Sequence, residues 1–213
     1  MSTDTLHPDM ETDILQHLQE SAMRNFDLGN YFEAEALLGK LLNLSEAKYG
    51  PQFQGRDATR QTLIAALCKQ GKLDDAERVL AKYGPQFECK AASLEILATA
   101  CCNENKLVKA EFFLLELLKD PTTQPLQRST AMHDLAAIYL TKNDLEAAEE
   151  YCKQSVEERE SILGEGHPFV YQSITLLGRI YAVKDNLQGK EACKNLLPHN
   201  FQRKISFLLT DQL

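Results

Sequence analysis

The chain has 213 residues, of which 44% are apolar and 25% charged, with 10 glycines and 7 prolines. This composition excludes a disordered, collagen-like or disulfide-stapled chain and indicates a globular or solenoid protein. The formal net charge of -8 repels phosphate backbones, so nucleic acid is not expected as a partner.

The sequence lacks the signals of a membrane or secreted protein. No apolar run approaches the eighteen or so residues of a membrane span, and only acidic charges precede the first basic residue, Arg24. Six cysteines fall in no paired spacing, and two of them, Cys101 and Cys102, are adjacent, which suits a reducing compartment. We therefore expect a cytoplasmic protein with no membrane partner.

An exact internal repeat organises the chain. Residues 47–53, with the sequence AKYGPQF, recur unchanged as residues 81–87, 34 positions later. A second spacing also recurs: 21 residues separate Gly50 from Gly71, Gly84 from Asn105, and Gly164 from Asp185. The sequence therefore predicts one structural unit used several times.

Each unit contains a helical stretch, a turn residue that tolerates positive φ, and a second helical stretch. The predicted turns lie at Gly29, Gly71, Asn105, Asn143 and Asp185. In chain order we expect a disordered tail over residues 1–11, repeats over about 12–50, 51–84, 85–121, 122–164 and 165–197, and a C-terminal capping helix or tail over 198–213.

Small residues inside the second helices predict close helix packing, because a larger side chain would hold two helix axes apart. Four repeats place an alanine there: Ala34, Ala76, Ala110 and Ala148. The fifth repeat has Lys190 instead, with Gly189 beside it, so its hairpin is expected to pack loosely or in a shifted register.

The second helices are expected to differ in length. The second helix of the first repeat, about 31–48, is eight residues longer than that of the second repeat, about 73–82. This is about two turns and keeps the apolar face aligned.

Two segments resemble the tetratricopeptide repeat family. The similarity is closest over residues 135–149, in LAAIY followed by NDLEAAE, and over 177–181, LGRIY. Residues 159–168, RESILGEGHP, further resemble the linker of the kinesin-light-chain-like subtype. The resemblance covers about residues 12–197 and implies an all-α, right-handed α-solenoid of five antiparallel helical hairpins, a superhelix that binds other proteins.

No residue pattern indicates catalysis, a cofactor or a metal. The five histidines lie in separate segments, and Gly71-Lys72 lacks the upstream glycine of a phosphate-binding loop. His133 is interpreted as a solvated or partner-contacting side chain, the cysteines as packing residues, and His167-Pro168 as the opening of a helix. We therefore expect no enzymatic activity, no cofactor, no metal site and no small-molecule substrate.

First helices of stacked hairpins line a concave surface, so the predicted groove residues come from them. They are Gln61, Thr62, Lys69, Glu95, Thr99, His133, Ala137, Leu140, Thr175, Leu176 and Arg179. Family members that clamp a C-terminal carboxylate use basic residues and asparagine where this chain has Gln19, Met23 and Thr62, which argues against such a clamp. The groove is expected to be neutral or mildly acidic, apart from Lys69 and Arg179.

These features predict a non-enzymatic scaffold or adaptor that binds a peptide or helix of another protein. The alternative is a sensor or regulatory segment of a larger signalling protein of the nucleotide-binding switch type, suggested by the apolar residues at 207–209.

Overall fold

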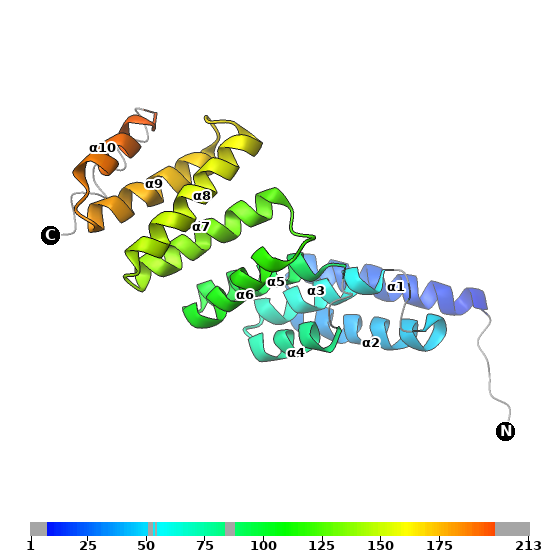
Figure 1. The fold of residues 1–213 in the computed structure, drawn as a ribbon. Coiled ribbons are helices and arrows are strands. Elements are labelled where there is room, and N and C mark those ends of the chain that lie inside the picture. Colours follow the sequence, from blue (N-terminus) through cyan, green and yellow to red (C-terminus); the bar gives the residue numbers. More distant parts are fainter. Residues whose placement is uncertain (1–7, 51–52, 54, 84–87, 199–213) are drawn as a thin grey trace, which may run out of the picture. The chain divides into compact units, whose positions relative to one another are not determined.

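A computed structural model describes residues 8–50, 53, 55–83 and 88–198 of the chain (Figure 1). Within these residues every regular element is an α-helix. The ten helices are α1 Pro8–Asp27, α2 Tyr31–Tyr49, α3 Arg56–Lys69, α4 Leu73–Tyr83, α5 Lys90–Asn103, α6 Leu107–Lys119, α7 Pro125–Thr141, α8 Leu145–Leu163, α9 Pro168–Val183 and α10 Leu187–Asn195. Each of the five expected repeats therefore contains two helices.

All five predicted turns are confirmed by their backbone conformation. The residues Gly29, Gly71, Asn105, Asn143 and Asp185 have φ values of 80°, 75°, 55°, 61° and 55°. Glycine adopts this left-handed conformation without a steric penalty, and asparagine and aspartate tolerate it better than other residues. The turn chemistry therefore ends one helix and starts the next at the positions that the sequence indicates.

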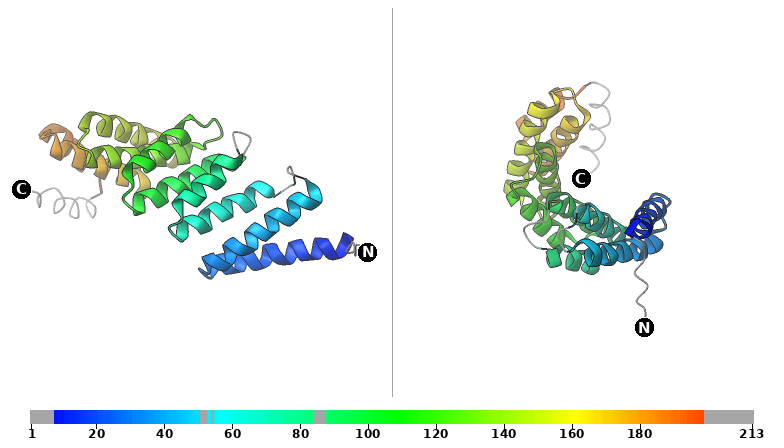
Figure 2. Two further views of the ribbon diagram at one scale, coloured as in Figure 1. Left: turned by 90° about the horizontal axis from the view of Figure 1, so that it is seen from below. Right: turned by 90° about the vertical axis from the view of Figure 1, so that its right-hand side faces the viewer.

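The chain divides into two compact units, 1–106 and 107–213. In the first unit α1 packs on α2, α2 on α3, and α3 on both α4 and α5. In the second unit α6 packs on α7, α7 on α8, α8 on α9, and α9 on α10. Figure 2 shows the helices of each unit side by side.

The predicted small residues lie in the interior between packed helices. Ala34, Ala76, Ala110 and Ala148 are all completely buried. In the fifth repeat Gly189 has the close contact, because a methyl group at this position would lie 2.7 Å from the Tyr181 ring. The register of α10 is thus shifted by one residue relative to the alanine position of the other repeats.

One expected boundary is wrong. Helix α1 begins at Pro8, so residues 8–11 belong to a helix and not to a disordered tail. Proline suits the first turn of a helix because its missing N–H has no intrahelical partner there. Residues 1–7 and 199–213 lie outside the described residues, and the predicted capping helix lies almost wholly among them.

Helix lengths follow the sequence prediction. Helix α2 has 19 residues and α4 has 11, a difference of eight.

His167-Pro168 opens helix α9 as expected. The His167 ring accepts a hydrogen bond from the Phe169 N–H, and Pro168 occupies the first helical position.

Candidate functional site

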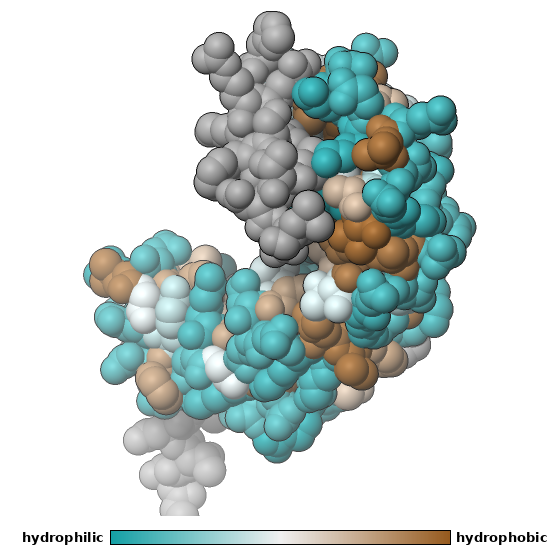
Figure 3. Space-filling view, turned by 90° about the vertical axis from the view of Figure 1, so that its left-hand side faces the viewer, coloured by the Kyte–Doolittle hydropathy of each residue, from teal (hydrophilic) through white to brown (hydrophobic). Residues whose placement is uncertain are grey.

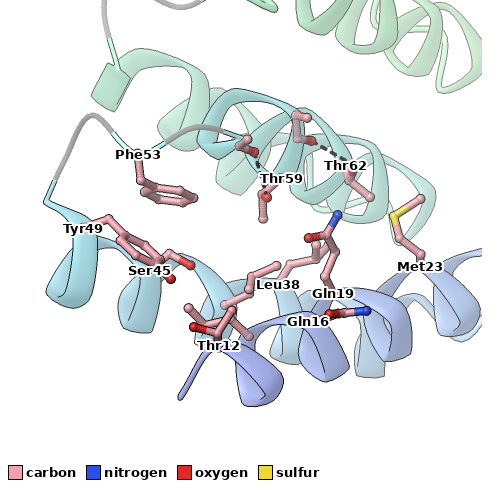
Figure 4. A pocket seen from close by; sticks show the side chains of 14 residues that line it. Thr12, Gln16, Gln19, Met23, Leu38, Ser45, Tyr49, Phe53, Thr59 and Thr62 are labelled. Carbon is pink, nitrogen blue, oxygen red and sulfur yellow. Dashed lines mark hydrogen bonds between the residues drawn. The ribbon is translucent and has the colours of Figure 1, made fainter. Parts of the chain in front are cut away.

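A cleft of about 800 Å³ opens in the first unit between α1, α2 and α3 (Figure 4). Helix α1 and the start of α3 form its walls, and α2 forms its floor. The lining residues are Thr12, Leu15, Gln16, Gln19, Met23, Leu38, Leu41, Ser45, Tyr49, Phe53, Gly55, Ala58, Thr59 and Thr62.

The cleft exists because two neighbouring first helices are separated. Helices α3 and α5 pack directly on each other, whereas α1 and α3 both pack on α2 and have little contact with one another. The long α2 also continues past the start of α3 and brings Ser45 and Tyr49 into the lining. Phe53, from the linker that follows α2, lies with Tyr49 at one end of the cleft, and Met23 lies at the other (Figure 4).

The lining is apolar at its base and partly apolar at its rim. Leu38 and Leu41 of α2 are 2% and 5% exposed at the bottom. Tyr49 is 51% and Met23 41% exposed, so both retain surface that a ligand could bury. A methionine and an aromatic ring adapt well to an apolar ligand, because the thioether chain is flexible and the ring offers a large contact area.

The polar lining groups carry no charge. Thr59 and Thr62 each donate a hydrogen bond to a carbonyl oxygen four residues earlier, at Gly55 and Ala58, over 3.0 Å in both cases. Their hydroxyl hydrogens are therefore used inside α3. The side-chain amide of Gln19 extends from α1 into the cleft (Figure 4).

Charged side chains lie beside the cleft and bind one another. Lys48 donates to the Thr12 hydroxyl over 3.0 Å. Arg60, 3% exposed, binds Glu46 over 2.8 Å and Asp57 over 3.3 Å. The Arg60–Glu46 pair joins α3 to α2, and none of the residues that line the cleft is charged.

The predicted groove residues are divided between the two units. The first unit holds Gln61, Thr62, Lys69, Glu95 and Thr99, and only Thr62 of these lines the cleft. Lys69 and Thr99 are exposed elsewhere on α3 and α5. The second unit holds His133, Ala137, Leu140, Thr175, Leu176 and Arg179, of which Arg179 is exposed.

Two predicted groove residues contact neighbouring helices of the second unit. Leu176 is only 4% exposed and belongs to the hydrophobic cluster with Ile180 and Cys193. His133 is partly buried, and its Nδ1 lies 3.1 Å from the Ser173 hydroxyl of α9. Burial, together with the charge of Arg159, lowers the pKa of His133 to about 4. The assignment of Leu176 fails because the position of a residue along its helix does not say which neighbouring helix covers it.

A buried polar cluster surrounds His133. Arg159 of α8 is 3% exposed and donates to the Phe169 carbonyl over 2.8 Å and to the Ser173 hydroxyl over 2.9 Å. Ser155 contacts Ser173 over 3.0 Å and donates to the Ser129 carbonyl over 2.8 Å. The cluster joins α7, α8 and α9, and the sequence patterns gave no sign of it.

The cysteine thiols are weak acids in this fold. Burial raises the pKa of Cys68 and of Cys152 to about 12, and that of Cys193 to about 11. A thiol reacts and binds metal as its thiolate, so these groups behave as packing residues near neutral pH.

Over the described residues, no helix combines the length and apolarity needed to cross a membrane.

The surface outside the cleft has scattered apolar side chains. The most exposed are Val108, Leu187, Leu28 and Phe32, at 74%, 72%, 69% and 67%. Figure 3 shows one face, on which apolar patches lie separately among hydrophilic side chains. Scattered apolar residues are normal on protein surfaces.

Most of the lining was not predicted from the sequence: Thr12, Leu15, Gln16, Leu38, Leu41, Ser45, Tyr49, Phe53, Gly55, Ala58 and Thr59. Tyr49 and Phe53 belong to the repeated heptapeptide, which served only to find the repeat period. The available signal was an aromatic pair, with one ring at the end of a 19-residue second helix and the other in the linker that follows it. Gln19 and Met23, which the sequence placed on the groove side of the first helix, do line the cleft.

Helices paired through left-handed turns, with small residues at the close contacts, define an α-helical repeat protein. Residues 128–169 match the tetratricopeptide repeat model, and residues 59–82 match the PPR repeat model. The fold is also similar to crystal structures of kinesin-light-chain-like repeat proteins. Residues 128–169 thus match a tetratricopeptide repeat, and the described residues have an all-α helical-repeat fold similar to that of kinesin-light-chain-like repeat proteins.

Two of these structures show the extent of the similarity. One is that of kinesin light chain nearly identical TPR-like repeats from Podosopora anserina, with 22% identity, a TM-score of 0.63, and coverage of 93% of this chain and 97% of that one. The other is BtubC (BKLC) from P. vanneervenii, with 17% identity, a TM-score of 0.65, and coverage of 97% and 85%. A comparison with curated proteins found no match.

Proposed function

We propose that the chain is a scaffold that binds a peptide or helix of another protein, and that the cleft between α1, α2 and α3 is a principal contact surface. Tetratricopeptide repeats support a role in protein interaction. The observation that carries the proposal is the cleft itself, with an apolar base, exposed Tyr49 and Met23, and uncharged walls.

The chemistry of the cleft favours recognition over catalysis. Its lining groups are amides, hydroxyls, a thioether, a phenol, a phenyl ring and hydrocarbon chains. Groups of this kind bury apolar surface and accept or donate hydrogen bonds, but none is a general base poised near neutral pH. The proposal therefore assigns no enzymatic step and no small-molecule substrate to this surface.

A protein ligand is favoured over RNA. The PPR match covers residues 59–82, which span most of α3 and α4, a single helical hairpin. PPR proteins read one base per repeat, so recognition of a sequence needs several consecutive repeats. The net charge of -8 and the neutral cleft supply no attraction for phosphates.

The wider proposal keeps two expectations from the sequence. The exposed Lys69 and Arg179 remain candidate contact residues outside the cleft, and a cytoplasmic location follows from the cysteine pattern. The alternative role, a sensor segment of a signalling protein, rests on residues 207–209, which lie outside the described residues.

Capture of partners from cell extract, read by mass spectrometry, tests the scaffold. The bait is the full chain, and the comparison is the variant Ala58→Arg, which places a long charged side chain in the cleft. Ala36→Arg is the matched control, because Ala36 is exposed on α2, lies outside the lining and undergoes the same substitution. We expect a stoichiometric protein partner retained by the wild type and the control and lost with Ala58→Arg. Absence of any partner stoichiometric with the wild-type chain would refute the scaffold.

A further inference from the structure

The cleft also indicates what kind of ligand it takes, and this inference rests on the proposed function. We propose that its occupant is a partner helix of about three turns whose bound face is apolar and uncharged. In this arrangement the partner helix lies between α1 and α3, above α2, where the first helices leave a gap.

The shape of the cleft matches a helix laid lengthwise. On α1 the lining runs from Thr12 to Met23, twelve residues, and the two ends lie about 16 Å apart at a rise of 1.5 Å per residue. On α3 it runs from Gly55 to Thr62, about 10 Å. An occupant of about eleven helical residues would therefore lie along the whole α1 wall.

The backbone of the walls favours a helix over an extended peptide. The long walls are α-helices, whose interior N–H and C=O groups are hydrogen-bonded within the helix. An extended peptide has backbone donors and acceptors that need partners once they leave water. The Thr59 and Thr62 hydroxyls already donate inside α3, so they cannot donate to such a peptide without losing these bonds. A helix brings its own backbone bonds and needs only side-chain contacts.

The charge of the lining defines the face that binds. None of the fourteen lining residues is charged, so a buried carboxylate or ammonium group on the occupant would have no partner inside the cleft. Burying an unpaired charge is strongly unfavourable. The exposed parts of Met23 and Tyr49 lie at opposite ends of the cleft and favour apolar side chains on successive turns of the occupant.

The test is a selection from a displayed library of 14-residue helical peptides, carried out on the full chain. All outward positions are fixed, and the positions of one face are randomised to include apolar, polar, acidic and basic residues. We expect enriched peptides to carry apolar residues at i, i+4 and i+7 with no charge between them. Proline in the middle of an enriched peptide should weaken its binding at least about tenfold, because proline breaks the helix.

Three protein variants locate the binding of the enriched peptides. Ala58→Arg and Tyr49→Ala should each weaken it at least about tenfold, whereas Ala36→Arg should leave it within about twofold. Circular dichroism of each variant confirms that its helix content matches the wild type, and Tyr49→Ala removes atoms without adding a charge.

Several results would overturn the inference. These are enrichment of acidic faces, tolerance of the central proline, binding that is insensitive to both Ala58→Arg and Tyr49→Ala, or no enrichment at all. If a stoichiometric cellular partner is nevertheless captured by the wild-type chain, the scaffold remains and only the nature of its ligand is wrong. If neither experiment yields a ligand, both proposals fail.

Discussion

The shifted register of α10 leads to opposite effects of the same substitution at two nearby glycines. Gly189 on α10 faces Tyr181, and an added methyl group would lie 2.7–2.8 Å from three ring atoms. Gly178 on α9 faces Cys193, and its added methyl group would lie 3.5 Å from the Cys193 Cβ, an ordinary contact. We therefore expect Gly189→Ala to destabilise the last hairpin and Gly178→Ala to stabilise it.

The magnitudes follow from two effects. Replacing glycine by alanine inside a helix stabilises the folded state by roughly 0.5–1 kcal/mol, and this gain is common to both positions. Overpacking a well-filled site costs roughly 1–3 kcal/mol, and this cost applies at Gly189 alone because Tyr181 is only 9% exposed and cannot swing into solvent. The free energy of unfolding should thus differ between the two variants by about 1–3 kcal/mol.

Hydrogen exchange read by mass spectrometry on peptides from α9 and α10 is the appropriate assay. Stability in a repeat protein varies along the chain, so a global midpoint can miss a local effect. Protection of α10 should fall in Gly189→Ala and rise in Gly178→Ala. Adding Tyr181→Leu to Gly189→Ala should reduce the loss, because it removes the atoms that clash. Equal stabilisation by both alanines would show that Gly189 is not the close-contact residue.

Four further predictions test other parts of the molecule. The ammonium groups of Lys153 and Lys184 lower the pKa of Glu149 to about 2, so the stabilisation by Glu149 is present above its ordinary pKa and is lost as the pH falls toward 2. The difference in melting temperature between wild type and Glu149→Gln should therefore shrink between pH 5 and 2; a constant difference would contradict the assignment. Arg159→Met should cost about 1–3 kcal/mol in urea unfolding, since buried acceptors lose their donor, and Ser173→Ala should cost less in that background than alone. Iodoacetamide should label Cys152 at pH 8 only when urea opens the fold, because its thiol is buried with a pKa of about 12; labelling at the rate of an unfolded chain would refute this. Single-stranded RNA should not bind at about 150 mM salt in fluorescence anisotropy, and salt-sensitive binding would support an RNA role instead.

The local features of the fold could be predicted because they depend on neighbours in the sequence. A residue that tolerates positive φ ends a helix wherever it lies, and the turns at Gly29 and Asn143 show this for glycine and asparagine alike. Alanine at the fifth position after a turn predicted burial, and Ala34 and Ala148 are completely buried. The difference in length between α2 and α4 was also visible in the spacing of the turns.

The candidate site could be predicted only in part. Gln19, Met23 and Thr62 were placed on the inner side of their helices, and they do line the cleft. The assumption that all first helices present a surface in the same way failed for Leu176, which neighbouring helices cover. Sequence periodicity identifies the face of a helix, but it does not identify the neighbour packed on that face.

The amino-acid sequence by itself determined the repeat period, the helix pairs, their turns and the small residues at most of their contacts, because each of these depends on interactions over a few residues. Only the tertiary structure decided that α1 and α3 separate while α3 and α5 pack, and that Tyr49 and Phe53 close one end of the resulting cleft. It also decided that Gly189 takes the close contact in place of residue 190. The physical reason is that these features depend on how whole helices fill space against one another, and a single side chain, such as the Tyr181 ring, can shift that packing by one residue.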